Sequence, residues 1–327
     1  MTRVAAVDCG TNTIRLLVAD LTREETGRPR LEPLRRRNEI VRLGQGVDRT
    51  GLLDPAALER TLAVVEDYAA DCAELGVEPG RGARRFVATS ATRDARNRED
   101  FAAGVRSLLG VDPEVVSGQE EAHLSFAGSL LGARGTDDGG APRLVVDLGG
   151  GSTELVLGVD APAAAISLNT GSVRITERYL ADGVTPAAEA AARAEVRGLL
   201  DRAAQAVDLA ATGRLVGLAG TITTVTAHAL GLADFDAEAI DGAELAVGAA
   251  LASCDAIVHS TAAERESWAY LRPGRRDVFA AGALVWSEVI SRVVAETTAA
   301  GRPLAAAVTS LHDILDGIAL SLAVPVP

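Results

Sequence analysis

The residues with the clearest potential for chemistry lie in a glycine-rich stretch near the middle of the chain, LVVDLGGGSTELVLG at residues 144–158. Two apolar runs flank a turn of small residues, a pattern typical of a β-hairpin whose backbone N–H groups can approach a ligand closely. Phosphate oxygens suit such N–H groups, but Asp147 and Glu154 would repel a phosphate unless a cation lay between them. The stretch therefore predicts a phosphate site that uses Mg2+ or another hard divalent cation such as Mn2+. A flexible turn without function is the alternative, because a glycine-rich turn alone is a weak motif.

The same unit occurs a second time at the start of the chain, in VAAVDCGTNTIRLLVAD at residues 4–20. The aligned pairs are Asp8 with Asp147, Gly10 with Gly149, and Thr13 with Ser152. Two copies half a chain apart predict two similar domains, each offering a hairpin turn to a shared cleft. The pattern resembles the superfamily of acetate and sugar kinases, heat-shock chaperones and actin. This resemblance implies an α/β protein with two ribonuclease-H-like (actin-like ATPase) domains and a cleft between them.

Composition and charge exclude several classes of site. The chain has 327 residues, of which 48% are hydrophobic, enough for two domains with a core each. All 32 basic residues are arginine, whereas a Walker A loop, a pyridoxal Schiff base and a protein-kinase site each require lysine. The net charge of −13 argues against a nucleic-acid partner. No run approaches the ~20 apolar residues of a membrane span, and the three cysteines have no paired spacing, so we expect a reduced, cytoplasmic protein without a membrane partner.

Hydrophobic periodicity and turn signals place the elements of both domains. The order of strands and helices over residues 4–123 (β-β-β-α-β-α-β-α) matches a ribonuclease-H-like domain. We expect residues 1–123 in the first domain, a C-terminal helix at about 310–323 that packs back on it, and residues 124–309 in the second. Helices are also expected at 241–259 and 276–295, a turn at 89–93, an exposed loop at 136–142 and a frayed end at 325–327.

Several stretches together resemble the exopolyphosphatase and guanosine-pentaphosphate phosphatase (Ppx/GppA) family, in matching order and spacing from residue 4 to about 318. They are VDCGTNTIRL (7–16), RLGQGVDRTGLL (42–53), ATSATRDARN (88–97), SGQEEAHLSFAG (117–128), VDLGGGSTE (146–154), SLNTGSVRITE (167–177) and GLAGTITT (217–224). The hairpins alone do not separate a hydrolase from a kinase, but SGQEEA and ATSATRDARN do.

The resemblance also implies roles for individual residues. Glu121, the second glutamate of SGQEEA, would be the catalytic base that orients and deprotonates water. Arg93 would neutralise charge on the terminal phosphate. The other implied residues are metal ligands and phosphate-cradle positions, namely Asp147, Glu154 and (through water) Asp8 for the metal, and Thr11, Asn12, Thr13, Gly149, Gly150, Gly151, Ser152, Gly171 and Thr221 for phosphate. For Glu121 the alternative is an ordinary acid stabilised by the dipole of its helix.

The leading hypothesis is an exopolyphosphatase that removes the terminal phosphate of inorganic polyphosphate. Hydrolysis of guanosine pentaphosphate is close behind, because both substrates end in a phosphoanhydride. A kinase of the same superfamily and a non-catalytic sensor are further hypotheses, although a sensor would be expected to lose Glu121 or Arg93.

Other features of the sequence bear on the substrate and on rival chemistries. The chain ends after the two core domains, where many relatives continue, so we expect a preference for short or medium polyphosphate. Ser152 lacks the GxSxG context of a nucleophilic serine. The pair His312-Asp313 is read as a chance likeness to HD-type phosphohydrolases. A homodimer is left open.

Overall fold

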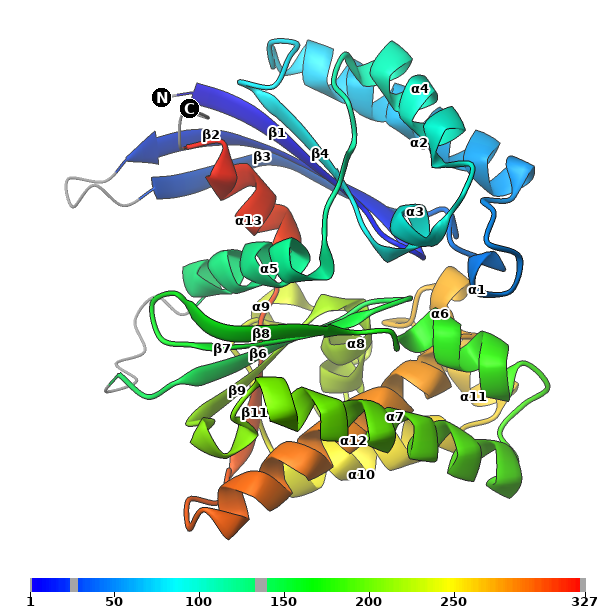
Figure 1. Cartoon of the computed structure of the whole chain (residues 1–327), viewed down its shortest axis with the longest axis vertical. Coiled ribbons are helices and arrows are strands. Elements are labelled where there is room, and N and C mark those ends of the chain that lie inside the picture. Colours follow the sequence, from blue (N-terminus) through cyan, green and yellow to red (C-terminus); the bar gives the residue numbers. More distant parts are fainter. Residues whose placement is uncertain (1, 24–28, 133–139, 324–327) are drawn as a thin grey trace. The chain divides into compact units, whose positions relative to one another are not determined.

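The computed structural model describes residues 2–23, 29–132 and 140–323 and divides the chain into two compact units (Figure 1). Unit 1 comprises Met1–Gly128 and Ile314–Pro327, and unit 2 comprises Ser129–Asp313. The expected loop at 136–142 lies largely outside the described residues, and the expected frayed end at 325–327 lies entirely outside them. The cleft expected between the domains stays a prediction.

Unit 1 is built on a five-stranded sheet of order β3-β2-β1-β4-β5. Its strands are β1 Thr2–Cys9, β2 Thr13–Arg23, β3 Pro29–Ile40, β4 Arg84–Ala88 and β5 Glu114–Val115. β1 pairs antiparallel with β2 and parallel with β4, while β2 pairs antiparallel with β3 and β4 pairs parallel with β5. Three antiparallel strands continued by parallel ones form the ribonuclease-H-like arrangement, so the predicted fold class is confirmed.

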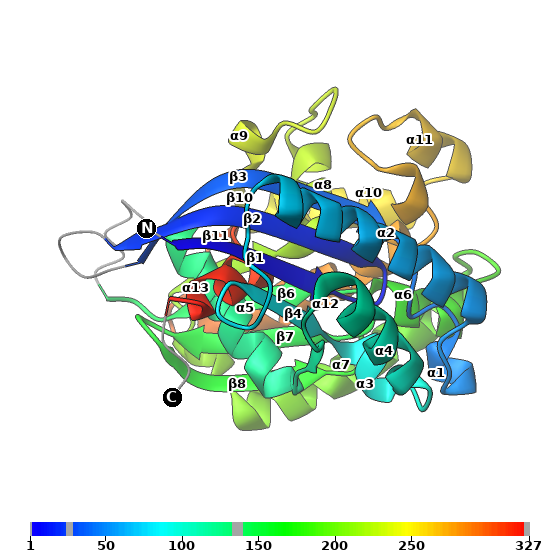
Figure 2. The ribbon, with the colours of Figure 1, turned by 90° about the horizontal axis from the view of Figure 1, so that it is seen from above.

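Helices cover both faces of this sheet. They are α1 Val47–Thr50, α2 Pro55–Glu74, α3 Ser90–Asp94, α4 Arg98–Leu109, α5 Gly118–Gly132 and α13 Ile314–Ser321. α2 and α4 lie on one face and α13 on the other, and Figure 2 shows α2 lying over the strands. In β1, Val7 and Cys9 belong to the core beneath α2 and α4, whereas Val4 and Ala6 belong to the core beneath α13. Because side chains alternate along a strand, Asp8 lies on the α13 face.

Unit 2 repeats this topology with one added strand. Its six-stranded sheet has the order β10-β11-β9-β6-β7-β8. The strands are β6 Arg143–Leu148, β7 Thr153–Gly158, β8 Pro162–Leu168, β9 Arg214–Leu218, β10 Glu244–Ala246 and β11 Ala306–Thr309. β6 pairs antiparallel with β7 and parallel with β9, as β1 does with β2 and β4. The sheets therefore correspond strand by strand, and β10 is the addition at the edge.

The helices of unit 2 bury one face of its sheet. They are α6 Ser172–Ile175, α7 Pro186–Ala206, α8 Ala219–Ala229, α9 Ala237–Ile240, α10 Val247–Val258, α11 Ala262–Ser267 and α12 Phe279–Ala299, with a π-helical turn at Thr176–Leu180 and 3-10 turns at Leu209–Ala211 and Pro273–Arg275. α7, α10 and α12 pack together on that face (Figure 1), around the buried Trp286. No helix among the described residues is both long and apolar enough to cross a bilayer.

Three expected elements differ in the structure. The helix expected at 241–259 begins only at Val247, because Glu244–Ala246 forms β10 and pairs antiparallel with β11. Pairing with a strand distant in sequence overrides the local helical pattern there. The helix expected at 276–295 begins at Phe279, after a 3-10 turn that starts at Pro273. The turn expected at 89–93 is the short helix α3.

Candidate active site

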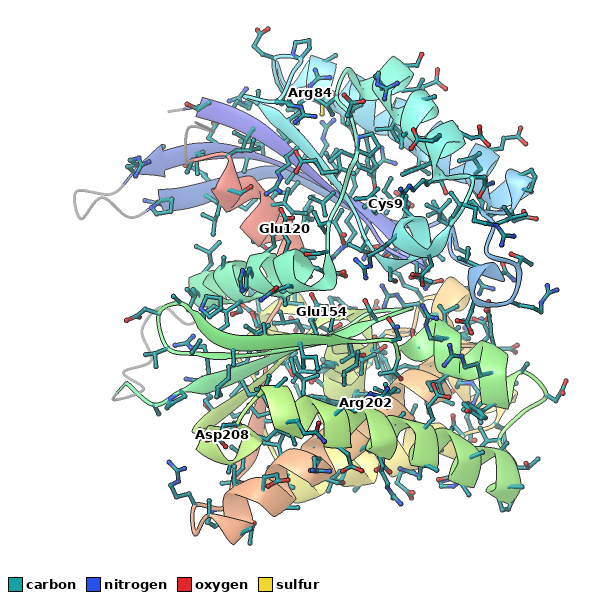
Figure 3. All side chains as sticks on the ribbon, in the orientation of Figure 1. Cys9, Arg84, Glu120, Glu154, Arg202 and Asp208 are labelled. Carbon is teal, nitrogen blue, oxygen red and sulfur yellow. The ribbon has the colours of Figure 1, made fainter. Side chains whose placement is uncertain are left out.

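The glycine turn of unit 2, residues 149–152, joins β6 to β7. The Gly149 amide donates to the Ser152 carbonyl at 3.0 Å, which closes the turn. Asp147 and Glu154 stand directly opposite each other across the hairpin, so their side chains share one face of the sheet. Both are buried, and Glu154 accepts a hydrogen bond from Ser167 Oγ at 2.7 Å. Figure 3 labels Glu154 on β7.

The carbonyl groups of the glycine turn are held from behind by α6. The Gly149 carbonyl accepts from the Ser172 amide at 3.1 Å, and the Gly150 carbonyl accepts from the amides of Val173 and Arg174 at 2.9 and 3.1 Å. The Gly151 carbonyl accepts from the side-chain Nε of Arg174 at 2.9 Å. Three successive carbonyls therefore point toward the start of α6.

This anchoring fixes where the amides of the turn point. In a trans peptide the carbonyl of one residue and the N–H of the next point in opposite directions. The amides of Gly150, Gly151 and Ser152 therefore point away from α6, and they have no acceptor among the described residues. Successive N–H groups on one side of a turn are suited to bind phosphate oxygens.

Gly171 and Thr221 complete this part of unit 2. A Cβ on Gly171 would lie 2.6 Å from the carbonyl oxygens of both Gly149 and Gly150, so only glycine allows α6 to approach the turn. Thr221 lies in the first turn of α8, which begins directly after β9. A Cβ on Gly282 would lie 2.6 Å from Thr221 Oγ1 and 3.2 Å from Ser172 Cβ, so Thr221 lies beside the start of α6. All the residues that were predicted from this half of the sequence thus gather around one turn.

The corresponding turn of unit 1, residues 10–13, is built in the same way. The Gly10 amide donates to the Thr13 carbonyl at 2.9 Å. The Asn12 carbonyl accepts from the amides of Val41 and Arg42 at 3.0 and 2.9 Å, just beyond the end of β3. Two further hydrogen bonds anchor the turn. The Thr11 carbonyl accepts from the Gly44 amide at 2.8 Å, and Thr11 Oγ1 is hydrogen-bonded to Ser90 Oγ at 2.9 Å. The amide of Asn12 and that of Thr13 therefore point away from residues 41–44.

Asp8 differs from its counterpart Asp147 in what faces it. Arg15 stands opposite Asp8 across the β1–β2 hairpin. Its Nε and Nη2 donate to Asp8 Oδ2 at 2.9 and 2.6 Å. The Asp8 carboxylate is 5% exposed, so this ion pair is largely shielded from water. Its charge is therefore compensated within the hairpin.

Glu121 and Arg93, the predicted base and the predicted arginine, contact each other in unit 1. Arg93 Nη1 donates to Glu121 Oε2 at 3.2 Å and to the Val116 carbonyl at 2.7 Å. Glu121 lies in the first turn of α5 and is buried, while its neighbour Glu120 points elsewhere and binds Arg85 at 2.7 Å (Figure 3 labels Glu120). Ser117 Oγ accepts from the Glu120 amide at 3.2 Å and so caps this turn. The arginine holds the Glu121 carboxylate in one orientation beside a positive charge.

The family of this chain follows from its similarity to known proteins. The model of the Ppx/GppA phosphatase family matches residues 21–299. The chain belongs to this family. Exopolyphosphatase 2 of Mycobacterium tuberculosis is 44% identical over 329 residues, which cover 99% of each chain. The bifunctional 3-dehydroquinate synthase/phosphatase of Fusobacterium nucleatum is 28% identical over 292 residues, or 88% of this chain and 43% of that protein.

Solved structures of the Ppx/GppA family have the same fold. The crystal structure of an exopolyphosphatase-like protein has a TM-score of 0.90 at 43% identity, covering 98% of this chain and 97% of its own. The Ppx/GppA family member of Aquifex aeolicus has a TM-score of 0.75 at 25% identity, with the same coverage. The predicted family and the predicted fold are both confirmed.

The metal ligands expected in this Ppx/GppA chain can be tested against the donor groups present. Asp147 and Glu154 offer carboxylate oxygens from opposite positions of one hairpin, next to a turn of outward amides. Mg2+ is commonly held by one or two carboxylates together with substrate phosphates, so this donor set fits Mg2+ or Mn2+. Among the described residues no group of three or more His, Cys, Asp or Glu could hold a metal ion. The role of Asp8 through water stays a prediction.

Two contacts in the Ppx/GppA site were not foreseen from the sequence. Arg275 lies against Gly220 at the start of α8, where a Cβ would fall 1.7 Å from Arg275 Nη1. Arg174 binds the Gly151 carbonyl, although it stands in the stretch SLNTGSVRITE that already carried the family resemblance. Neither residue is marked by spacing, because each lies against a glycine that is distant in sequence.

Proposed function

We propose that this Ppx/GppA phosphatase is an exopolyphosphatase, which hydrolyses the terminal phosphoanhydride bond of inorganic polyphosphate and prefers short or medium chains. The observation that carries the proposal is the end-to-end similarity to a protein named exopolyphosphatase 2, 44% identical over 99% of both chains. No large segment is added or missing between the two. The geometry of both units supports the same chemistry, since each holds a turn with outward amides.

The described side chains have distinct tasks in this reaction. Glu121 accepts a proton from water, and the resulting oxygen nucleophile attacks the terminal phosphorus. The bond from that phosphorus to the bridging oxygen breaks, so the products are orthophosphate and a polyphosphate one unit shorter. Arg93 holds Glu121 and offers its guanidinium to the equatorial oxygens of the terminal phosphate. The amides of Gly150, Gly151 and Ser152 bind phosphate oxygens.

A divalent cation, Mg2+ or Mn2+, would be held by Asp147 and Glu154. When bound, it supplies positive charge that offsets repulsion between these carboxylates and the phosphate chain. The two acids lie on adjacent strands of one hairpin, so their separation is set by the sheet. Asp8 is the third acidic residue of the proposed metal site and contacts the ion through a water molecule.

Phosphate release from polyphosphate of graded chain lengths, with Mg2+ and with a chelator, tests this function. We expect metal-dependent release of orthophosphate, with kcat/KM highest on short or medium chains. Guanosine pentaphosphate assayed in parallel should be a poorer substrate, and label from ATP should not appear on sugars. No release from polyphosphate, or a steep rise of kcat/KM toward the longest polymers, would contradict the proposal or its chain-length part.

The proposal also includes the cellular compartment of the enzyme. Cys9, Cys72 and Cys254 are all buried free thiols. Burial raises the pKa of the Cys254 thiol to about 12, which leaves it protonated at neutral pH. Three unpaired cysteines suit a reducing compartment, so we place the enzyme in the cytoplasm. A homodimer stays a prediction, to be tested by light scattering.

A further inference from the structure

We propose that Arg174 is a positioning residue, whose guanidinium fixes the Ser152 amide of the glycine turn in the direction required to bind a phosphate oxygen. The inference rests on the proposed function, because it assigns a role within the same phosphate site. Arg174 belongs to α6 and does not itself need to contact the substrate.

Arg174 holds the turn at two successive carbonyls. Its backbone amide donates to the Gly150 carbonyl at 3.1 Å, and its Nε donates to the Gly151 carbonyl at 2.9 Å. The residue is 9% exposed, so these bonds form away from bulk water. A charged donor strengthens the second bond, since hydrogen bonds to ionised groups are the stronger ones.

The Gly151 carbonyl depends on this side chain because α6 has no backbone amide for it. The Ser172 amide donates to the Gly149 carbonyl, and the amides of Val173 and Arg174 donate to the Gly150 carbonyl. The amide that follows these, that of Ile175, donates to the Gly171 carbonyl within the helix. The corresponding carbonyl of unit 1, on Asn12, is instead held by two backbone amides. A substitution of Arg174 can therefore remove the side-chain bond to the Gly151 carbonyl. The bonds to the Asn12 carbonyl come from backbone amides and do not depend on a side chain.

Loss of this anchor would change the direction of one amide. The Gly151 carbonyl and the Ser152 N–H belong to the same planar peptide, so they rotate together. Residue 151 is glycine, which offers little steric resistance to such a rotation. Without Arg174 the peptide can turn its N–H away from the phosphate while the chain on both sides keeps its place.

The substitution Arg174→Lys separates the effect of the directional hydrogen bond from the effect of the positive charge. Lys places a methylene group where Arg has Nε, so Arg174→Lys keeps the positive charge and loses the bond to the Gly151 carbonyl. A matched control is Arg84, which is 7% exposed in unit 1 and donates to the carbonyls of Leu109 and Val77 at 3.0 and 2.6 Å. Arg84 anchors backbone outside both turns (Figure 3).

The experiment measures kcat and KM for a short polyphosphate with Arg174→Lys, Arg174→Gln and Arg84→Lys. We expect both Arg174 variants to raise KM by about 10- to 100-fold with little change in kcat, because a ground-state contact to a charged group is lost. Arg84→Lys should lower the melting temperature and leave KM unchanged. A KM for Arg174→Lys that matches the Arg84→Lys value would overturn the positioning role.

Binding of tripolyphosphate by calorimetry separates this inference from the proposed function. If the wild-type chain hydrolyses no polyphosphate but binds tripolyphosphate, and Arg174→Lys weakens that binding by the same factor, the function fails and the positioning role stands. If wild type and Arg174→Lys bind equally, the positioning role fails whatever the activity. Absence of binding in the wild type would overturn both, since the turn would then hold no phosphate.

Discussion

The two hairpin turns share a backbone plan and differ in charge. Both close with an amide-to-carbonyl bond across four residues, and both have carbonyls tied to the segment that follows the third strand. In unit 1 the aspartate faces Arg15, whereas in unit 2 it faces Glu154. Like charges directly opposite on a sheet are destabilising unless a cation offsets them. In the proposed function the divalent ion therefore belongs to the hairpin of unit 2, whereas Asp8 in unit 1 faces an arginine within its own hairpin.

The anchors of the two turns differ as well. In unit 1 the turn is held by backbone amides at residues 41–44, and in unit 2 by the start of α6 with the Arg174 side chain. In unit 1 a side-chain bond, that of Thr11 Oγ1 to Ser90 Oγ, is added to carbonyls that backbone amides already hold, whereas the Gly151 carbonyl of unit 2 is bound by a side chain.

The largest effect is expected outside both turns, because in the proposed mechanism the turns bind phosphate and Glu121 accepts the proton from water. Glu121→Gln should lower kcat by about 10²- to 10⁴-fold, the usual contribution of a general base, with tripolyphosphate binding largely kept. Glu120→Gln is the matched control, because that neighbour pairs with Arg85 and should leave kcat near the wild-type value. Steady-state phosphate release measures both. Equal kcat in the two variants would remove Glu121 from the mechanism.

The charge difference between the hairpins predicts unequal metal dependence. Glu154→Gln should raise the Mg2+ concentration for half-maximal activity at least about tenfold, since even loss of an outer-shell partner costs that much metal affinity. Asp8→Asn should shift it by no more than about tenfold, the lower end of the range for an outer-shell partner, because Arg15 already compensates Asp8. Mg2+ titrations of phosphate release compare the two variants. An equal shift of the half-maximal Mg2+ concentration in both variants would contradict the proposed difference between the hairpins and would favour Asp8 as a direct ligand of the ion.

The anchoring glycines, Gly171 and Gly44, should respond differently to alanine. A Cβ on Gly171 would meet backbone oxygens at 2.6 Å, whereas one on Gly44 would meet the Thr11 and Ala91 side chains at 2.4 and 2.8 Å. Gly171→Ala should lose about 1–3 kcal/mol of unfolding free energy, more than Gly44→Ala, because its three nearest contacts are all backbone atoms, whereas the nearest contact at Gly44 is the Thr11 methyl group.

Urea unfolding measures this comparison, and Gly198 provides its control. Gly198 lies inside α7 with no heavy atom within 4 Å of an added Cβ, so Gly198→Ala should gain about 0.5–1 kcal/mol. A larger loss for Gly44→Ala than for Gly171→Ala would show that the unit 1 anchor is the tighter one.

The smallest effect concerns a second opposed pair on the β1–β2 hairpin, Arg3 and Asp20. The hydrogen bond from Arg3 lowers the pKa of Asp20 below its usual range. A lowered folded-state pKa stabilises above the unfolded value of about 3.9, and this stabilisation is lost as pH falls through the folded pKa. Asp20→Asn should thus lower the urea midpoint slightly at pH 7 and not at pH values below the folded pKa. A difference that persists in acid would exclude the ion pair as its cause.

The sequence went far in predicting the fold and the family, because the residues that indicate them sit in local patterns. The repeated turn, the fold class and the family follow from runs of adjacent residues, and the alignment that pairs Asp8 with Asp147 also places Arg15 on Glu154. The charge difference between the hairpins was therefore present in the sequence. β10 was missed, because its pairing partner β11 is about sixty residues away and local periodicity cannot show it.

Local patterns of residues are enough to show that two Asp–Gly turns occur and which residue types flank them, since short-range rules of strand and turn formation act on neighbouring residues. The tertiary structure decided which way the turn amides point, because that depends on carbonyl partners such as Val173 and Arg174, which lie 23 residues from the glycines they hold. It also decided that Arg93 binds Glu121, across 28 residues of sequence. Packing alone brings such groups together, so no local pattern encodes their contact.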